Sequence, residues 1–258
     1  MGWTQDILAV LSGGLVGFSL GLIGGGGSIL GVPLLLYIVG VGDPHVAIGT
    51  SALAVAANAF VNLLSHWRAG TVKWPCAATF AAAGVVGAAI GSTLGKMVGG
   101  QQLLFLFALV MIAVGAAMLR PRAAGGDDNV RITPAIALRL VGIGVLVGAV
   151  SGFFGIGGGF LIVPGIMLGA GMPMLNAIGS SLFSVGIFGV TTAANYAVSG
   201  LIDWGVAALF IAGGVVGGSA GTRTALRLAT GRRTLRYVFS GVIFAVAMYM
   251  LLRTGLIL

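Results

Sequence analysis

Two runs of glycine interrupt apolar segments of the sequence, and their exposed backbone could bind an anion. A helix that begins directly after such a run, near Ser28 or near Phe160, has N–H groups without intrahelical partners at its positively polarised end. Glycine lets a ligand approach this backbone closely, so each run predicts a cradle of amide groups for a small anion. The alternative is that the glycines only allow helices to pack closely. The first run is Gly24, Gly25, Gly26 and Gly27, followed by Ser28, and the second contains Gly155, Gly157, Gly158 and Gly159.

A stripe of polar side chains follows each glycine run at helical spacing. Steps of three and four residues place these side chains on one face of a helix. Amides and hydroxyls in an apolar segment need partners, either on a neighbouring helix or in a substrate. Because the stripe recurs beside both runs, the pattern favours a lined pathway. The first stripe contains Thr50, Ser51, Asn58, Asn62, Ser65 and His66, and the second contains Ser180, Ser181, Ser184, Thr191, Thr192, Asn195 and Ser199.

His66 and Arg68 stand together at the end of the first stripe. Arg68 could attract anions toward the pathway, or it could anchor the helix end at a membrane surface by snorkelling. His66 could exchange a proton, since imidazole is the side chain that titrates nearest neutral pH, or it could be a structural residue at a helix end. If transport follows a pH gradient, the proton is carried either by His66 or by a weak-acid substrate itself.

The composition excludes a water-soluble globular protein. The chain has 258 residues, of which 58% are hydrophobic and only 7% are charged, whereas an average soluble domain is about 25% charged. A polytopic membrane protein is the class that remains. The acidic residues are Asp6, Asp43, Asp127, Asp128 and Asp203, and none lies deep in an apolar segment. A carboxylate proton relay and a carboxylate-lined cation permease are therefore disfavoured.

The sequence shows no set of residues whose types and spacing suit catalysis or the binding of a cofactor. The single Cys76 excludes an internal disulfide and is most simply a small core residue, and no Cys or His cluster has metal-ligand spacing. His45 and His66 lie about 31 Å apart along one predicted helix, too far to share a metal or a haem. We expect no enzymatic activity, no metal and no cofactor. The net charge of +8 orients the chain in a lipid bilayer and does not indicate a nucleic-acid partner.

The chain is an internal repeat. The segment from Gly17 to Pro33 matches the segment from Gly148 to Pro164 at an offset of 131 residues. After a gap of one residue, the segments Ala47–Ser51, Gly70–Trp74 and Gly84–Gly87 match segments that lie 130 residues later. Self-similarity at this scale indicates duplicated units. We expect a first repeat over residues 1–119, a cytoplasmic linker over 120–133 and a second repeat over 134–258.

Each half contains four apolar stretches, and only the opening one is too long for a single span. Its 34 residues in the first half, Ile7–Gly40, would form a helix of about 51 Å against about 30 Å of hydrocarbon. Its glycine run also disfavours a continuous helix. The stretch is therefore either one broken span or a hairpin of two short helices. The other stretches are roughly Pro44–Trp67, Trp74–Val98 and Leu103–Leu119, then Pro134–Gly171, Met174–Ser199, Trp204–Leu228 and Leu235–Leu252.

The distribution of basic residues favours the hairpin. If each opening stretch returns to its own side, all of the 13 Lys and Arg residues except Lys96 and Arg253 share one face. If each stretch crosses once, the basic residues divide almost evenly. Cytoplasmic loops of membrane proteins are enriched in Lys and Arg, so the first arrangement is the expected one. It predicts an all-α membrane protein of two inverted-topology repeats, each a glycine-rich broken-helix hairpin followed by three transmembrane helices. Both termini are expected outside.

Several of these motifs together resemble the TauE/SafE family, also known as the sulfite exporter or anion permease family. The resemblance rests on the glycine pattern from Gly17 to Pro33, on its copy, on the repeated Ala-Ile-Gly-Thr/Ser-Ser, and on His66-x-Arg68-x-Gly70-x-Val72-x-Trp74. The match covers nearly the whole chain. The second half departs from the pattern because Tyr196 and Val198 stand where the first half has His66 and Arg68. A symmetric basic site is therefore not expected.

The resemblance implies a transporter of small sulfur-containing anions, such as sulfite or organosulfonates, in a bacterial or archaeal inner membrane. It further implies export linked to the proton gradient. Two other interpretations remain open at this point, namely a passive anion channel and a permease for another small organic anion. The expected partners are a small anionic substrate and the lipid bilayer.

Overall fold

The computed structural model of the protein describes residues 2–119, 132–155, 159–227, 241 and 244–253. Every regular element within these ranges is helical, as the composition predicts. The elements in chain order are α1 (Trp3–Ile23), the 3-10 helix η1 (Gly24–Leu30), α2 (Gly31–Leu34), the π-helix η2 (Leu35–Val39), α3 (Pro44–Arg68), α4 (Trp74–Met97), α5 (Gly100–Leu119), α6 (Pro134–Phe154), α7 (Gly159–Ala170), α8 (Met174–Val198), α9 (Trp204–Arg227) and a short apolar helix over Phe244–Arg253. Most of the predicted linker and part of the last apolar stretch lie outside these ranges.

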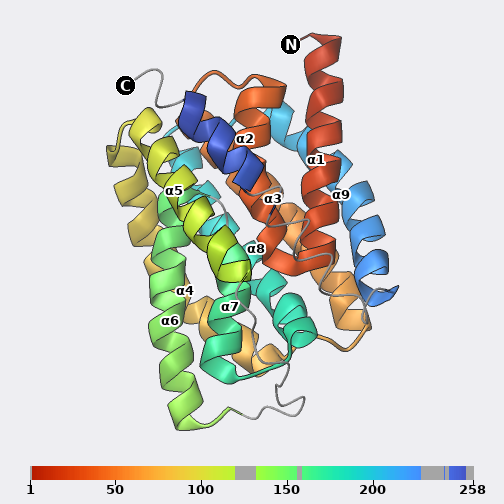
Figure 1. Ribbon diagram of the computed structural model, residues 1–258, viewed down its shortest axis with the longest axis vertical. Coiled ribbons are helices and arrows are strands. Elements are labelled where there is room, and N and C mark those ends of the chain that lie inside the picture. The colour runs from red at the N-terminus through yellow and green to blue at the C-terminus, as the bar shows by residue number, and fades with distance from the viewer. Residues whose placement is uncertain (1, 120–131, 156–158, 228–240, 242–243, 254–258) are drawn as a thin grey trace.

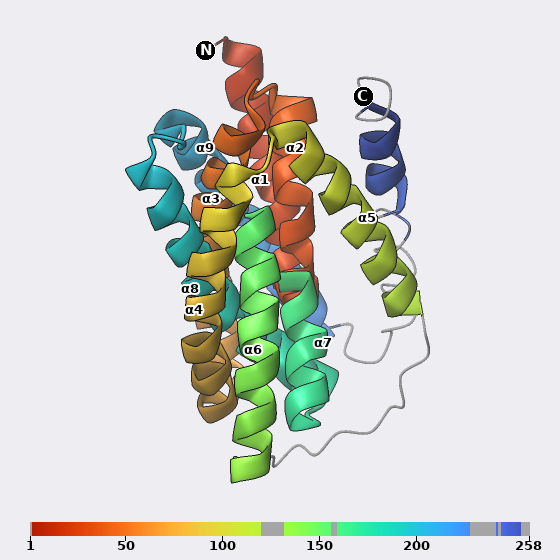
Figure 2. The same cartoon turned by 90° about the vertical axis from the view of Figure 1, so that its left-hand side faces the viewer.

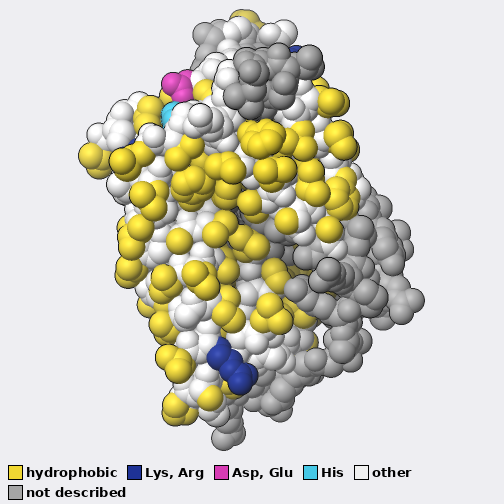
Figure 3. All heavy atoms as spheres, turned by 60° about the vertical axis from the view of Figure 1, so that its left-hand side comes forward, with side chains coloured by type: hydrophobic (Ala, Val, Ile, Leu, Met, Phe, Trp, Pro, Cys, Tyr) yellow, Lys and Arg dark blue, Asp and Glu magenta, His cyan; other side chains and the backbone are white. Residues whose placement is uncertain are grey.

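Six helices of the described chain are long and apolar enough to cross a membrane, judged by length and composition. They are α1, α3, α4, α6, α8 and α9. Large apolar side chains on their outer faces are exposed, for example Leu15, Val86 and Leu146. Figure 3 shows hydrophobic side chains over the middle of one face, with charged and histidine side chains toward its two ends. This is the surface of a protein embedded in lipid through several helices.

Each opening stretch is a hairpin. The Gln5 side chain, near the start of α1, donates a hydrogen bond to the carbonyl oxygen of Val39, at the end of η2, with an N–O distance of 2.9 Å. In the second half, Gly169 near the end of α7 lies against the side chain of Leu140 near the start of α6. In both views α1 descends from the N-terminus and the segment after it returns to the same end (Figures 1 and 2). Of the two alternatives that the length left open, the structure has the hairpin.

The two turns use glycine in a backbone conformation that other residues rarely adopt. Gly24 follows α1 with φ of 71°, and Gly155 follows α6 with φ of 64°. These two positions are equivalent in the sequence repeat. A Cβ atom destabilises positive φ, so a glycine at each position allows the chain to reverse without strain.

The halves interlock through helix pairs with glycine at their contacts. The α1 helix packs along α9, and α6 packs along α4. Gly17 faces the backbone of Gly214, and Gly148 faces the backbone of Gly84, so closely that a Cβ atom would collide with the opposing main chain. Gly17 and Gly148 are repeat equivalents, as are Gly84 and Gly214. Each hairpin therefore packs against a helix of the other half.

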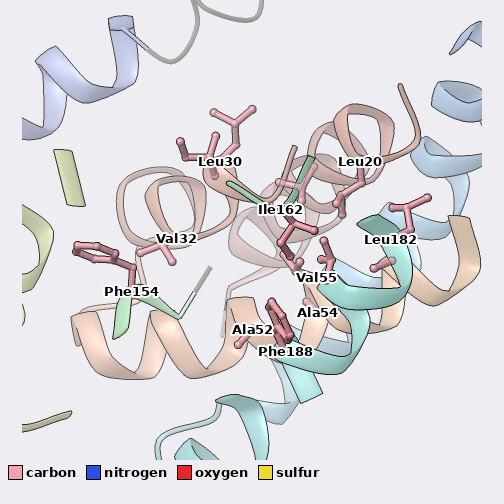
Figure 4. Close-up of a cluster of buried hydrophobic side chains, with 14 of the residues drawn as sticks. Leu20, Leu30, Val32, Ala52, Ala54, Val55, Phe154, Ile162, Leu182 and Phe188 are labelled. Carbon is pink, nitrogen blue, oxygen red and sulfur yellow. The ribbon is translucent and has the colours of Figure 1, made fainter. Parts of the chain in front are cut away.

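The apolar core surrounds α3 and α8, which pack against each other. Figure 4 shows Val55 of α3, Ile162 of α7 and Phe188 of α8 pointing toward one region, and all three are fully buried. Lipid tails are as apolar as these side chains, so their burial contributes little to helix association in a membrane. Close approach of backbones at the glycine contacts is consequently more important for holding the helices together.

Side-chain caps stabilise the starts of α3 and α6. The Asp43 carboxylate accepts hydrogen bonds from the backbone N–H groups of His45 at 2.7 Å and Val46 at 3.4 Å, with Pro44 at the first helical position. Asp43 is thus the N-cap of α3. Thr133 caps α6 in the same way through the N–H of Ile136. Such caps satisfy N–H groups that have no partner within the helix.

The packing of α6 predicts different effects for two glycines on the same helix. Gly148→Ala places a methyl group against the Gly84 carbonyl of α4, whereas Gly142 is exposed and has no atom near its missing Cβ. We expect Gly148→Ala to destabilise the protein by about 1–3 kcal/mol. Gly142→Ala should leave stability unchanged or raise it by up to about 1 kcal/mol. The stability of both variants is measured in detergent by heating, because unfolding exposes the buried Cys76 thiol to a fluorogenic maleimide. Equal melting temperatures for the two variants would contradict the packing of Gly148 against α4.

Candidate functional site

The tips of the two hairpins pack against the central helices of the opposite halves. A Cβ atom on Gly24 would lie 3.0 Å from the Ser181 hydroxyl and close to Ile178 of α8, and one on Gly155 would collide with Ile48 of α3. Ile48 and Ile178 are repeat equivalents, so the two tips make equivalent contacts. The η1 segment also packs against α7. Gly24, Gly27, Gly155 and Gly159 are thus buried beside the polar stripes.

The first tip differs from the predicted amide cradle. We expected the returning α-helix to begin near Ser28, but the glycine run forms the tighter 3-10 helix and the α-helical turn begins only at Gly31. Backbone N–H groups in a 3-10 helix bond to carbonyls three residues earlier, which leaves fewer of them for a ligand. Gly27 contacts the backbone of Leu20, and Ser28 is fully buried. Gly25 and Gly26 lie within η1.

At the second tip, α7 begins at Gly159, close to the predicted start near Phe160. Gly159 is buried, and Gly155 ends α6, where its N–H bonds to the carbonyl of Gly152. Gly157 and Gly158 lie outside the described residues. The two tips therefore reverse the chain at equivalent positions but differ in the helix that follows.

A buried column of polar side chains runs along α3 beside α1 and α9. We call it the polar column and define it as Asn58, Asn62 and His66 of α3 with Thr222 of α9. All four are at most 2% exposed. Asn58 lies over Gly214 of α9, and Asn62 lies over Gly218 one turn further on. The glycines of α9 make the room that the two amides occupy.

Several atoms of this column have no hydrogen-bond partner within the described protein. Neither Nδ2 nor Oδ1 of Asn58 has one. Asn62 accepts a bond from the Thr222 hydroxyl at 3.2 Å, but its Nδ2 is unpartnered. A buried polar group without a partner costs about 1–3 kcal/mol. The column thus offers two amide donors and one acceptor to a polar ligand.

His66 ends the column, and both of its ring nitrogens are engaged. Nε2 lies 3.2 Å from the Gly21 carbonyl oxygen of α1, and Nδ1 lies 3.1 Å from the Thr71 hydroxyl. A carbonyl only accepts, so Nε2 carries the proton of the neutral ring, and the Thr71 hydroxyl donates its own proton to the His66 carbonyl oxygen at 3.0 Å. Neither partner has a negative charge. Arg68, two residues further on, is exposed at the end of α3.

The hydroxyls at the start of each stripe anchor loops of the opposite half. Thr50 accepts a hydrogen bond from the backbone N–H of Asp203 at 2.9 Å, and Ser180 accepts one from the N–H of Lys73 at 2.9 Å. These are equivalent contacts at the starts of α9 and α4. Both acceptors therefore have a structural partner.

The next hydroxyls of the stripes differ from one another. Ser51 is buried against Gly31 and its oxygen has no partner in the described structure. Ser181 donates to the carbonyl of Ile178 at 2.8 Å. Thr191 donates to the carbonyl of Ile187, within its own helix. Of these three side chains, Ser51 is the one whose oxygen is left for a ligand.

Asn195 is held in a network that the sequence analysis did not predict. Its Nδ2 donates to the hydroxyls of Ser92 at 2.6 Å and Thr93 at 3.0 Å, and its Oδ1 accepts from the Lys96 ammonium at 2.7 Å. Lys96 also donates to Ser199. This network joins the ends of α4 and α8. Both polar groups of the Asn195 amide are thereby satisfied.

The sequence analysis missed Thr222, Ser92 and Lys96 because they stand alone among small residues of α9 and α4. The repeat carried a usable signal, since Ser92 and Thr222 are equivalent at the offset of 130. Each is a buried hydroxyl bonded to an asparagine of the adjacent central helix. No comparable signal marks Lys96, whose equivalent in the second half is Leu226.

The second half has no full counterpart of the polar column. Phe188 occupies the position equivalent to Asn58 and lies over Gly84 of α4, as Asn58 lies over Gly214 of α9. Tyr196 occupies the position of His66, and its hydroxyl has no partner in the described structure. The contact between α4 and α8 is thus apolar at the level of Phe188, whereas Thr192, at the position of Asn62, is buried and its hydroxyl has no partner in the described structure. Within the described residues, no three His, Cys, Asp or Glu side chains come together.

Comparison with known proteins agrees with these features. The family described as "Sulfite exporter TauE/SafE" matches residues 9–250. A "Probable membrane transporter protein" of Xylella fastidiosa (strain 9a5c) is 51% identical over 96% of this chain and 95% of its own length. The "Probable membrane transporter protein YunE" of Bacillus subtilis (strain 168) is 29% identical over 83% of this chain and 86% of its own. No solved structure gives a significant match. With its apolar helices, its two hairpins and this match over nearly its whole length, the chain belongs to the TauE/SafE sulfite exporter family and is a multi-pass membrane transporter.

Proposed function

We propose that the protein is a secondary transporter that exports small sulfur-containing oxyanions, such as sulfite or organosulfonates, and that this transport is linked to the proton gradient. The observation that carries this proposal is the set of unpartnered amide atoms of Asn58 and Asn62 in the middle of the helix assembly. Such groups are stabilised when a substrate supplies their missing hydrogen bonds. Oxygen atoms of an oxyanion accept bonds from the two Nδ2 groups.

The proposed binding region joins the polar column to the hairpin tips. Asn58 lies beside the contact between α1 and α9, where Gly17 meets Gly214. Ser51, with its unpartnered hydroxyl, lies two turns earlier on α3, beside the returning segment of the first hairpin. Arg68 at the exposed end of α3 attracts anions to the mouth of this path. The region contains neutral donors, so it can release the anion as readily as it binds it.

We further propose that the halves, residues 1–119 and 134–258, are inverted repeats joined by a cytoplasmic linker over 120–133. In the figures, α1 and α6 begin at opposite ends of the molecule (Figures 1 and 2). Equivalent contacts at both hairpins and at both glycine contacts support a shared plan. In this plan the pairs of α1 with α9 and of α6 with α4 move as units around the central helices, which exposes the site alternately to the two sides.

The orientation follows from the basic residues. Arg68 ends α3, Lys73 precedes α4, Arg139 lies near the start of α6 and Arg223 lies near the end of α9. These helix ends lie at the end of the molecule opposite to the N-terminus (Figure 1). The positive-inside bias assigns this end to the cytoplasm.

Cysteine labelling tests this orientation in a Cys76→Ala background. Gly2→Cys stands before α1, and Ala135→Cys stands at the exposed start of α6. We expect a membrane-impermeant maleimide to modify position 2 in intact cells and position 135 only after permeabilisation. Modification of both positions from the same side would contradict the inverted arrangement.

A flux measurement tests the transport proposal directly. We expect purified protein in liposomes to carry labelled sulfite with saturation, and an imposed pH gradient should accelerate this flux by about tenfold. Chloride should compete weakly, because it offers a single atom where an oxyanion offers several acceptors. Flux that follows the membrane potential and ignores the pH gradient would instead identify a passive channel.

Asn58 and Asn195 should respond differently to the same substitution. Asn58→Leu removes unpartnered amide atoms, so we expect an unchanged or higher melting temperature together with a loss of sulfite flux of about tenfold or more. Asn195→Leu removes the partners of Lys96 and Ser92, so we expect destabilisation by about 1–3 kcal/mol. Flux per folded protein should fall less than in Asn58→Leu.

For both variants the control is the melting temperature of the unmodified protein, measured by the reaction of the Cys76 thiol with the fluorogenic maleimide during heating. If Asn58→Leu melts at a lower temperature and transports normally, its amide is a structural group and the site lies elsewhere.

A further inference from the structure

We propose that the site binds the singly charged, protonated form of an oxyanion, and that this substrate carries the coupling proton on its own O–H group. The inference rests on the proposed function and narrows it from sulfite and organosulfonates to oxyanions that keep an O–H. For sulfite this species is the hydrogen sulfite ion, which crosses as a unit and releases its proton by ionising on the far side. One proton and one sulfite then move in the same direction without titration of any protein group, and a pH gradient acts by setting the concentration of hydrogen sulfite on each side.

The amide of Asn58 presents one hydrogen-bond acceptor and one donor side by side. Its Oδ1 accepts and its Nδ2 donates, and both are fully buried without partners in the described protein. An oxyanion that keeps an O–H presents the complementary pair, a donor hydroxyl beside an acceptor oxygen. The Asn62 Nδ2 supplies a further donor one turn away. A fully ionised oxyanion has acceptors alone, so it would place a negative oxygen against Oδ1 of Asn58.

The distance of the charged side chains of α1, α3 and α9 from Asn58 also favours a monoanion over a dianion. By helical rise, the nearest charged or titratable side chains on α1, α3 and α9 stand about 12 Å or more from the level of Asn58. The burial cost of an ion grows with the square of its charge, so a dianion costs about four times as much as a monoanion in such a site. The ionisable residues of the elements around Asn58 are Asp6 on α1, His45, His66 and Arg68 on α3, Tyr196 on α8, and Asp203, Arg223 and Arg227 at α9.

His66 is a poorer proton carrier in this structure. Its ring nitrogens face the Gly21 carbonyl and the Thr71 hydroxyl, and neither group is charged. A second proton would put a positive charge on a fully buried ring whose two partners are neutral. The ring instead fixes the end of α3 against α1, below the unpartnered amide of Asn58.

The repeat provides a matched control position. Phe188 packs over Gly84 as Asn58 packs over Gly214, at the equivalent depth of the other half. A phenyl ring has no amide donor or acceptor, so we assign one oxyanion site to the chain. Phe188→Leu therefore perturbs equivalent packing without removing an amide.

The test measures initial flux in liposomes for labelled sulfite, methanesulfonate and sulfate, between about pH 6 and about pH 8. Methanesulfonate is a monoanion without an O–H, and sulfate is a dianion throughout this range. We expect sulfite flux to follow the concentration of hydrogen sulfite at every pH, with methanesulfonate and sulfate slower by about tenfold or more. His66→Gln and Phe188→Leu should keep this dependence, whereas Asn58→Leu should lose the preference for sulfite over methanesulfonate.

Four results would overturn the inference. Methanesulfonate flux equal to that of sulfite would show that the O–H is not recognised, and the proposed anion transport would still stand. Sulfite flux that follows the dianion, or pH dependence abolished by His66→Gln in folded protein, would place the proton elsewhere. Absence of flux for every anion would overturn the proposed function, and this inference with it. The comparison of substrates uses the unmodified protein, so it does not depend on any variant folding.

Discussion

A polar group inside a lipid bilayer must find its hydrogen bonds within the protein, and this constraint governs the whole structure. Backbone groups meet it by forming helices, and irregular backbone is possible only where protein surrounds it. The hairpin turns at Gly24 and Gly155 are therefore enclosed by α8 and α3 of the opposite halves. The same constraint makes the amide of Asn58 informative, because no group in the described part of the chain supplies its hydrogen bonds.

Glycine allows this enclosure in two ways. At the turns it takes a positive φ, and along α1, α4, α6 and α9 it lets backbones touch. Because apolar burial drives helix association only weakly in lipid, such close contacts are a principal source of cohesion. Both glycine contacts join a hairpin of one half to a helix of the other. The halves consequently cannot form separate domains, although each is a repeat in sequence.

The same framework carries different chemistry in its two halves. Gly214 leaves room for an amide and Gly84 leaves room for a phenyl ring, so equivalent backbones hold a polar column on one side and an apolar contact on the other. The hydroxyls of Thr50 and Ser180 remain equivalent because they serve the fold, anchoring the loops before α9 and α4. Symmetric residues in this chain are thus mainly structural, and the asymmetric ones identify the candidate site.

Much of this could be predicted from the sequence, because hydropathy, glycine runs and helical spacing are local properties. They indicated a helical membrane protein, the duplicated hairpins and the shared face of Asn58, Asn62 and His66. Partners are not local. That the amide of Asn195 is bound by Ser92 and Lys96, while that of Asn58 has no partner, depends on which helices approach them. Likewise, the first glycine run forms a 3-10 helix under the packing of α7 and α8. Sequence determined which polar groups are buried, and only the tertiary contacts decided which of them remain available to a ligand.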